Sequence, residues 1–246
     1  MSGPGRVLSL VFGLSALFYA TEARAYCRTH GCDTTDVNQK CEYDANGCLM
    51  SGPLLHWPSG CVSFTVQKDG SRLRGISYEA AREAITAGFQ QWQNADCGGG
   101  LLPEVEVSYF GAVECRQAEY NQDAGNANVF MFRDDRWPYE NAVDTLALTT
   151  LIFNANNGEI YDADVEINTF DASLSIDNVG RGDIDFASVI THEIGHFFGL
   201  SHSKSYGATM GVSYSPGATD MATIEADDEA GICQALAPGR ATTTNS

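Results

Sequence analysis

Residues 191–203 read THEIGHFFGLSHS, a stretch that holds three of the five histidines in a chain of 246 residues. On an α-helix His192 and His196 are four positions apart, so their imidazoles lie on one face and can bind the same ion. Gly199 allows a sharp turn at the end of that helix, which brings His202 back as a third ligand. Three protein ligands leave a fourth coordination position open, and this pattern is typical of a catalytic zinc site rather than a closed structural one.

Glu193 lies beside this pair, where it can reach a metal-bound water without being a ligand. Zinc lowers the pKa of bound water to about 7, and a carboxylate placed next to that water can act as its general base. A short H-E-x-x-H alone also occurs by chance or in an ordinary core helix. With Gly199 and His202 at fixed spacing, an accidental match falls to roughly one in 10⁵ for average residue frequencies. Buried histidines without a metal would also need separate hydrogen-bond partners.

The stretch resembles the zinc motif of the metzincins, and its ending, with Leu200 and Ser203, is similar to the matrixin branch of the secreted, bacterial type. A second element supports the resemblance. Ala-Thr-Met at 208–210 stands where metzincins carry their Met-turn, eight residues after the third histidine. The resemblance implies that Met210 lies under the zinc ligands as an apolar floor, and that residues 211–219 wall the pocket for the substrate side chain that follows the cleaved bond.

Three further segments resemble matrixins: AITAGFQQW at 84–92, GEIYDADVEIN at 158–168 and ADDEAGICQAL at 226–236. The second of these departs from the family pattern. Where animal matrixins carry a histidine ligand for a second, structural zinc, this chain has Asp164. The resemblance, with this departure, implies one catalytic zinc and no second His-bound zinc.

The spacing of apolar residues predicts the fold class. Alternation predicts strands at 61–67, 104–113 and 128–133, and two more within 146–168 joined by an Asn-Asn-Gly turn. Helical spacing predicts one helix over 77–92 capped by Ser77, a second from Asp185 to Gly199, and a short third one within 223–236. We therefore expect one α/β (α+β) domain with a mixed twisted sheet, two long helices and a short C-terminal helix, as in a metzincin-like catalytic domain.

The chain divides into four parts by composition. Residues 1–25 are typical of a signal peptide, with Arg6, an apolar run at 7–20 and an A-x-A cleavage site at 23–25, so we expect secretion. A short membrane anchor is the alternative, but the run is too short to span a membrane, and no span is expected in the mature form. We expect a Cys-rich strap at 26–60, the catalytic domain at 61–236 and a disordered tail at 237–246.

Charge and cysteine content limit the function further. Removing Arg6, Arg24 and Glu22 with the signal peptide changes the formal charge from −18 to −19, and such a surface repels nucleic acid. Eight cysteines in an exported chain predict up to four disulfides and no free thiol. Cys97 and Cys115 are close enough in sequence to pair locally. A zinc cluster in CRTHGC at 27–32 is the weaker alternative in an oxidising compartment.

A second ion site is an open question at this point. Asp162, Asp164 and Glu166 alternate along a predicted strand, so they share one face and could bind Ca²⁺ as an additional ion. The alternative is a solvated acidic edge.

Together these residues predict a secreted zinc-dependent endopeptidase that hydrolyses peptide bonds with zinc-activated water and Glu193 as general base. We expect a monomer whose partner is a protein or peptide substrate, lying extended along the edge strand near 146–153. The alternative function is a non-catalytic metzincin-like module that binds a peptide or a surface partner. The intact Glu193 favours the enzyme, because a binding module does not need the base.

Overall fold

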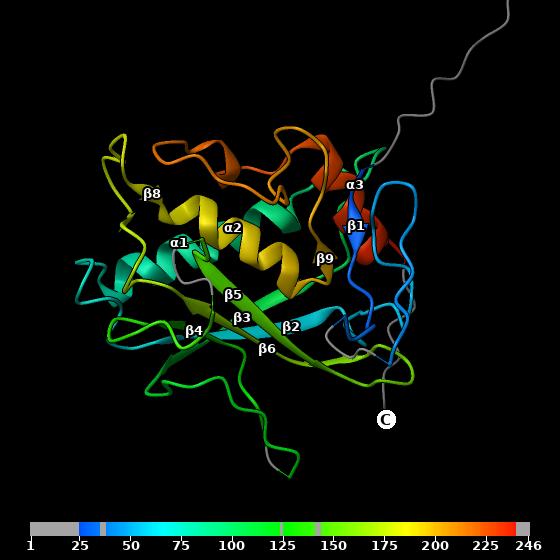
Figure 1. The fold of residues 1–246 in the computed structure, drawn as a ribbon, viewed down its shortest axis with the longest axis horizontal. Helices are drawn as coiled ribbons and strands as arrows, with labels where there is room; N and C mark the ends of the chain where they lie inside the picture. Colours follow the sequence, from blue (N-terminus) through cyan, green and yellow to red (C-terminus); the bar gives the residue numbers. More distant parts are fainter. Residues whose placement is uncertain (1–24, 35–37, 124, 141–143, 240–246) are drawn as a thin grey trace, which may run out of the picture.

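The computed structural model describes residues 25–34, 38–123, 125–140 and 144–239. The predicted signal peptide, apart from Ala25, lies outside the described residues, and so does the predicted tail from 240 onward. Within the described ranges the main element is a five-stranded sheet of order β3-β2-β4-β6-β5 (Figure 1). Its strands are β2 Cys61–Gln67, β3 Glu106–Val113, β4 Val129–Phe132, β5 Ala147–Phe153 and β6 Ile160–Ile167.

This sheet is mixed, as the sequence predicts. Strands β2, β3, β4 and β6 pair in parallel, whereas β5 runs antiparallel to β6 and forms one edge. Strand β3 starts two residues later than predicted. The N–H of Glu104 donates to the carbonyl of Leu236, so this residue contacts a segment late in the sequence instead of β2. The α+β fold class is confirmed.

Two long helices cover one face of the sheet: α1, Tyr78–Gln93, and α2, Phe186–Phe197 (Figure 1). Both begin at the predicted caps. The Ser77 side chain accepts a hydrogen bond from the N–H of Ala80 at 3.2 Å, and Asp185 accepts from the N–H of Ser188 at 2.9 Å. These bonds satisfy backbone donors that have no partner inside the helix.

The two helices pack closely because α1 carries a glycine at their crossing. A Cβ at Gly88 would lie 2.8 Å from Cδ1 of Ile194, closer than real side chains approach. The indole N–H of Trp92 then donates across the contact to the carbonyl of Thr191 at 2.8 Å. Trp92 is fully buried, so this hydrogen bond avoids the cost of leaving its N–H without a partner. The zinc-motif helix is thereby held against α1.

Short elements surround this core. They are β1 Cys27–Arg28, β7 Leu174–Ser175, β8 Ile184–Asp185, β9 Leu200–Ser201, the 3₁₀ helix η1 Asp220–Ala222 and α3 Ala226–Ala235. Strand β1 pairs with β9, immediately before His202. The indole N–H of Trp57 donates to the carbonyl of Phe197 at 2.8 Å, at the end of α2. Residues of the predicted strap therefore contact both sides of the turn that leads out of the zinc-motif helix.

The disulfides differ from the local pairing that the sequence predicts. Cys97 bonds to Cys233 in α3, and not to Cys115, because β3 carries the chain away from Cys97 before Cys115 is reached. Eight residues of strand extend the chain by about 26 Å, far more than a disulfide spans. Cys61 and Cys115 are unpaired and exposed, so the prediction of no free thiol is wrong.

Two further disulfides link cysteines of the N-terminal segment, Cys27 with Cys48 and Cys32 with Cys41. Both cysteines of CRTHGC are therefore oxidised, which excludes the alternative of a zinc cluster there. Within the described part of the chain, no helix is both long and apolar enough to cross a membrane.

Candidate active site

The three histidines of the motif surround one point. His192 and His196 project from α2, and His202 follows β9 after Gly199, whose φ of +83° permits the turn. The centroids of the three rings are 4.8, 4.9 and 5.2 Å apart. Each ring offers one nitrogen to a common position, with all three nitrogens within 4.8 Å of one another. Among the described residues, no other group of three or more potential metal ligands comes this close together.

Hydrogen bonds orient two of these rings. Nδ1 of His192 is 2.6 Å from the carbonyl of Thr209, and Nδ1 of His196 is 2.9 Å from the carbonyl of Leu200. A carbonyl only accepts, so each Nδ1 carries the proton and each Nε2 keeps its lone pair for an ion. Burial lowers the pKa of His192 to about 4 and lowers that of His196 as well. Both imidazoles are therefore neutral near pH 7, which is the form that binds zinc.

The methionine turn lies directly under the helix. Met210 is 1% exposed, and a Cβ at Gly195 would lie 2.2 Å from its sulfur. The thioether therefore fills the space that a side chain at position 195 would take, between the two ligand-bearing turns of α2. The role of Met210 as a floor for the zinc ligands stays a prediction.

Asp228 holds the turn in place, a role that the sequence analysis missed. Its two carboxylate oxygens accept from the N–H groups of Thr209 and Met210 at 2.7 and 3.0 Å, and the residue is fully buried. Because a carboxylate that accepts two backbone N–H groups fixes both peptide planes, α3 determines how Met210 is presented. The sequence does place an acidic residue in the first turn of the predicted C-terminal helix. It does not indicate the partners of that residue, which lie 18 and 19 residues away.

Glu193 is buried beside the histidines. It is 6% exposed, and its Oε2 accepts a hydrogen bond from the hydroxyl of Thr149 on β5 at 2.6 Å. Burial raises the pKa of this carboxyl, and the nearby His196 ring and the hydrogen bond from the Thr149 hydroxyl oppose that rise. Within the described residues no lysine or arginine pairs with it. The carboxyl therefore lies in the environment of a group that can accept and release a proton.

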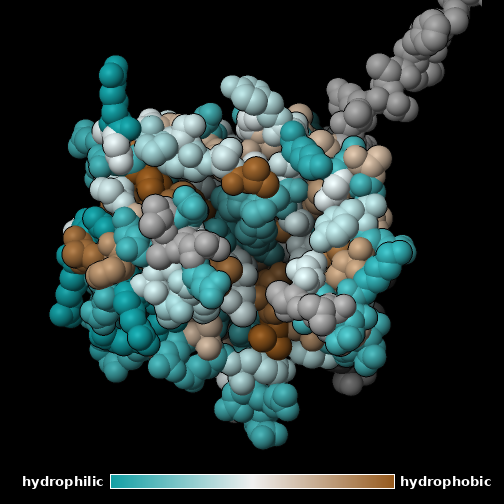
Figure 2. All heavy atoms as spheres, in the orientation of Figure 1, coloured by the Kyte–Doolittle hydropathy of each residue, from teal (hydrophilic) through white to brown (hydrophobic). Residues whose placement is uncertain are grey.

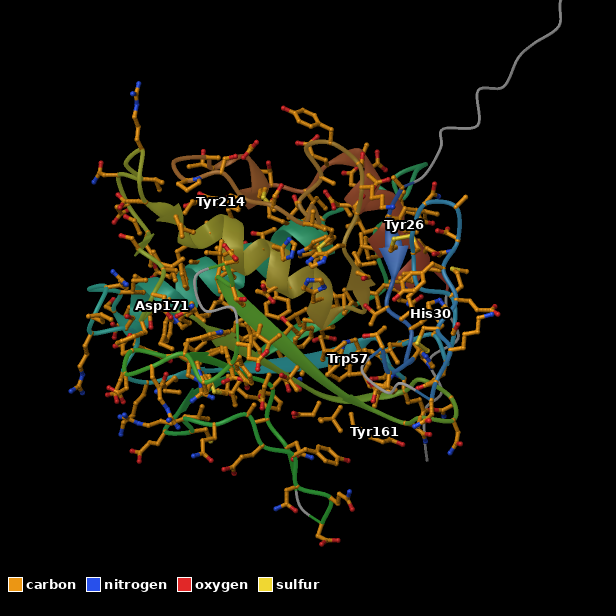
Figure 3. All side chains as sticks on the ribbon, viewed as in Figure 1. Tyr26, His30, Trp57, Tyr161, Asp171 and Tyr214 are labelled. Carbon is orange, nitrogen blue, oxygen red and sulfur yellow. A yellow bond between two sulfur atoms is a disulfide. The ribbon has the colours of Figure 1, made fainter. Side chains whose placement is uncertain are left out.

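A cleft of about 480 Å³ runs past these side chains, and Figure 2 shows the surface hollowed there. One wall is the edge strand β5 and the other is residues 211–214 after the methionine turn. Tyr214 lies beside the first turns of α2 (Figure 3). Its hydroxyl accepts from the N–H of Asp185 at 2.8 Å and donates to the carbonyl of Ala218. Two hydrogen bonds thereby hold the hydroxyl end of this side chain, within the segment 211–219 that the resemblance assigns to the pocket wall.

The three acidic residues proposed for Ca²⁺ share a face of β6, as predicted, but they are buried and have different partners. Asp164 accepts from the N–H groups of Val129 and Glu119 at 2.8 and 3.1 Å. Glu166 pairs with Arg133 and Tyr139. Asp162 is 2% exposed, and its Oδ1 has no partner. The alternative of a solvated acidic edge is therefore wrong.

The structure does not assemble these three carboxylates into a ligand group. Alternate residues of a strand are about 7 Å apart, and here Asp164 and Glu166 bond to different partners instead of converging with Asp162 on one point. The prediction of Ca²⁺ at Asp162, Asp164 and Glu166 gains no support from this arrangement.

Asp162 gives a prediction about pH. Burial and the nearby Asp164 raise the pKa of Asp162 to about 7, against about 3.9 in an unfolded chain. The free energy of unfolding is therefore not reduced by Asp162 below about pH 4, where the carboxyl is protonated in both states. It falls as the pH rises from about 4 through about 7, because the unfolded chain releases this proton first. We expect Asp162→Asn to be more stable than the wild type at pH 8, by on the order of 2–4 kcal/mol, with the difference shrinking toward pH 5. Chemical unfolding at both pH values measures this.

Parallel pH profiles for the two proteins would contradict the raised pKa. Calcium provides the second arm of the same experiment. If Ca²⁺ stabilised the wild type at pH 8 but left Asp162→Asn unchanged, Asp162 would be a cation ligand after all.

Three imidazoles around one point, a buried carboxylate beside them and a methionine packed against the same helix are compatible with a metzincin-type zinc site. The sequence model of the matrixin peptidase family (Peptidase M10, Matrixin) matches residues 56–236. The chain belongs to the matrixin family, which confirms the resemblance.

Among known proteins, the chain is similar to metalloendoproteinase 1-MMP of Arabidopsis thaliana, with 26% identity over 184 residues. That match covers 74% of this chain and 44% of the relative, so the chain spans less than half the length of that protein. Among solved structures, it is similar to metalloproteinase-II from Bacteroides fragilis, with 16% identity and a TM-score of 0.39. This match covers 74% of the chain and 54% of the other protein.

Proposed function

We propose that this protein is a secreted zinc-dependent endopeptidase. One observation carries the proposal: three imidazoles whose pKa values are lowered by burial converge on one point, in the same cleft as a buried carboxylate that pairs with no lysine or arginine among the described residues. Family membership supports the same function. A binding site for a peptide alone would gain nothing from burying Glu193, because desolvating a carboxylate is costly.

The ligands of the ion would be His192, His196 and His202 through their free ring nitrogens, and the arrangement of these donors fits zinc. When bound, zinc lowers the pKa of a coordinated water and polarises the substrate carbonyl. Glu193 would accept a proton from the attacking water and pass it to the leaving amine. Met210 supports the ligands from below, so that the rings keep their positions while the substrate reacts.

The substrate would lie along β5, which is the open edge of the sheet. One side of β5 is paired with β6, and the other side borders the cleft, where its main-chain groups are available to an extended peptide. The side chain after the cleaved bond would enter the cleft between α2 and residues 211–214. Tyr214 is held by two hydrogen bonds and would limit the depth of that pocket.

Removal of a signal peptide during export would also change a contact at the N-terminus. The N–H groups of Ala25 and Tyr26 both donate to Oδ1 of Asp227 in α3, at 2.9 and 3.1 Å, and Figure 3 shows Tyr26 beside this helix. Cleavage after Ala25 would turn the N–H of Tyr26 into an ammonium group facing a carboxylate.

The three disulfides among the described residues support an oxidising compartment.

The test of this function is metal dependence. We expect the purified mature protein to contain one zinc per chain and to cleave internal bonds in a mixed peptide library, detected by mass spectrometry. A chelator should stop cleavage and added zinc should restore it, because the water is activated only at the metal. His202→Ala should lose most of the zinc, since two ligands bind far more weakly than three.

Cleavage that persists without metal would contradict the proposal. Two zinc ions per chain that resist dialysis would contradict the single-zinc prediction drawn from Asp164.

A further inference from the structure

One hydroxyl group on the edge strand contacts the proposed general base. In the β5–β6 register Thr149 lies opposite Val165, which is fully buried in the core beneath the helices. Directly paired residues project to the same side of a sheet, so Thr149 faces α2. Its neighbours on that side of β5 are Ala147 and Leu151, which are apolar. A threonine in this row interrupts an otherwise apolar pattern.

The contact with Glu193 is short and direct. Oγ1 of Thr149 is 2.6 Å from Oε2 of Glu193 and 3.3 Å from its main-chain carbonyl. A hydroxyl has one proton to donate, and the shorter distance assigns it to the carboxylate. A hydroxyl that donates to an ionised carboxylate has this length. Within the described part of the chain, no other side chain donates a hydrogen bond to this carboxylate.

We infer that Thr149 is a positioning residue for Glu193: its hydroxyl holds Oε2, fixes the plane of the carboxylate and leaves Oε1 to take and return the proton. This inference rests on the proposed peptidase function. A glutamate side chain has three rotatable bonds, and a buried one without a fixed partner samples several orientations. Proton transfer needs the accepting oxygen within hydrogen-bond reach of the water, so one anchored oxygen keeps the other in place.

The test compares three single variants with the wild type, all loaded with zinc. Thr149→Val keeps the shape of the side chain and removes the hydroxyl. We expect kcat to fall by about 10–100-fold with KM within about 3-fold, because orientation is lost while substrate contacts remain. Thr149→Ser keeps the hydroxyl, and we expect its kcat within about 3-fold of the wild type.

Thr65→Val is the matched control. Thr65 is a buried strand threonine whose hydroxyl donates to the carbonyl of Asn128 at 3.2 Å, away from the cleft. It should lower stability to a similar degree and leave kcat unchanged. Zinc content, measured in every variant, should stay at one per chain.

Crystal structures of the zinc-loaded variants provide a readout that does not depend on activity. We expect Glu193 in one rotamer in the wild type and in Thr149→Ser, and in more than one in Thr149→Val. The inference is overturned if Thr149→Val keeps the wild-type kcat, if Thr149→Ser is as impaired as Thr149→Val, or if the loss lies in KM or in zinc content. An inactive wild type would instead overturn the proposed function, and this inference with it.

Discussion

Glu193→Ala should bind zinc as tightly as the wild type and lose about 10²–10⁴-fold of peptide hydrolysis, the usual worth of a positioned general base. All three imidazoles remain in this variant, and the carbonyls of Thr209 and Leu200 that orient His192 and His196 are not changed by the substitution. The fold should also remain, because removing a buried carboxylate relieves a desolvation cost. Single-turnover cleavage of a peptide selected from the library, with zinc content measured on the same sample, gives both quantities.

This experiment also separates the enzyme from a binding module. A module that only binds peptides would keep its affinity in Glu193→Ala, and its wild type would show no chelator-sensitive cleavage. Equal cleavage rates for the wild type and Glu193→Ala, both with zinc bound, would show that another group is the base.

The second large effect concerns stability. Loss of the Cys97–Cys233 disulfide, which closes a loop across a sequence separation of 136 residues, should cost about 3–5 kcal/mol of unfolding free energy. A bond across so many residues restricts the unfolded chain strongly, and it also joins the loop after α1 to α3, whose Asp228 holds the methionine turn. We expect the double variant Cys97→Ala/Cys233→Ala to unfold roughly 10 °C lower than the wild type, measured by calorimetry.

The matched control is Cys61→Ser/Cys115→Ser, which removes the same number of sulfur atoms from two exposed, unpaired positions. Its unfolding temperature should change little. A similar loss in both double variants would mean that the thiols, rather than the closed loop, determine the effect.

The convergence of the three histidines could be predicted because it depends on residues that are close in sequence. The distance from His192 to His196 is one turn of helix, and the turn at Gly199 needs a positive φ that glycine provides. The caps Ser77 and Asp185 are local in the same way, since each bonds to the N–H three residues later.

Features that depend on contacts distant in sequence could not be predicted. Thr149 and Glu193 are 44 residues apart, and their contact follows from the register of β5 against β6 and from the packing of α2 over the sheet. The Cys97–Cys233 bond likewise requires α3 to return to the end of α1. Alternation along β6 correctly predicted that the carboxylate of Asp162 shares a face with its neighbours. It did not reveal that other segments cover this face, because alternation does not report what packs against a strand.

Gly195 has a consequence for how the zinc motif can be varied. The motif is written with two free positions between Glu193 and His196, yet neither is free in this protein. Ile194 is fully buried against α1, and a methyl group at Gly195 would occupy the place of the Met210 sulfur. A library randomised at both positions should therefore return glycine at 195 and a narrow set of apolar residues at 194. The residue that can stand at position 195 is therefore determined by Met210, which packs against it from fifteen positions further along the chain.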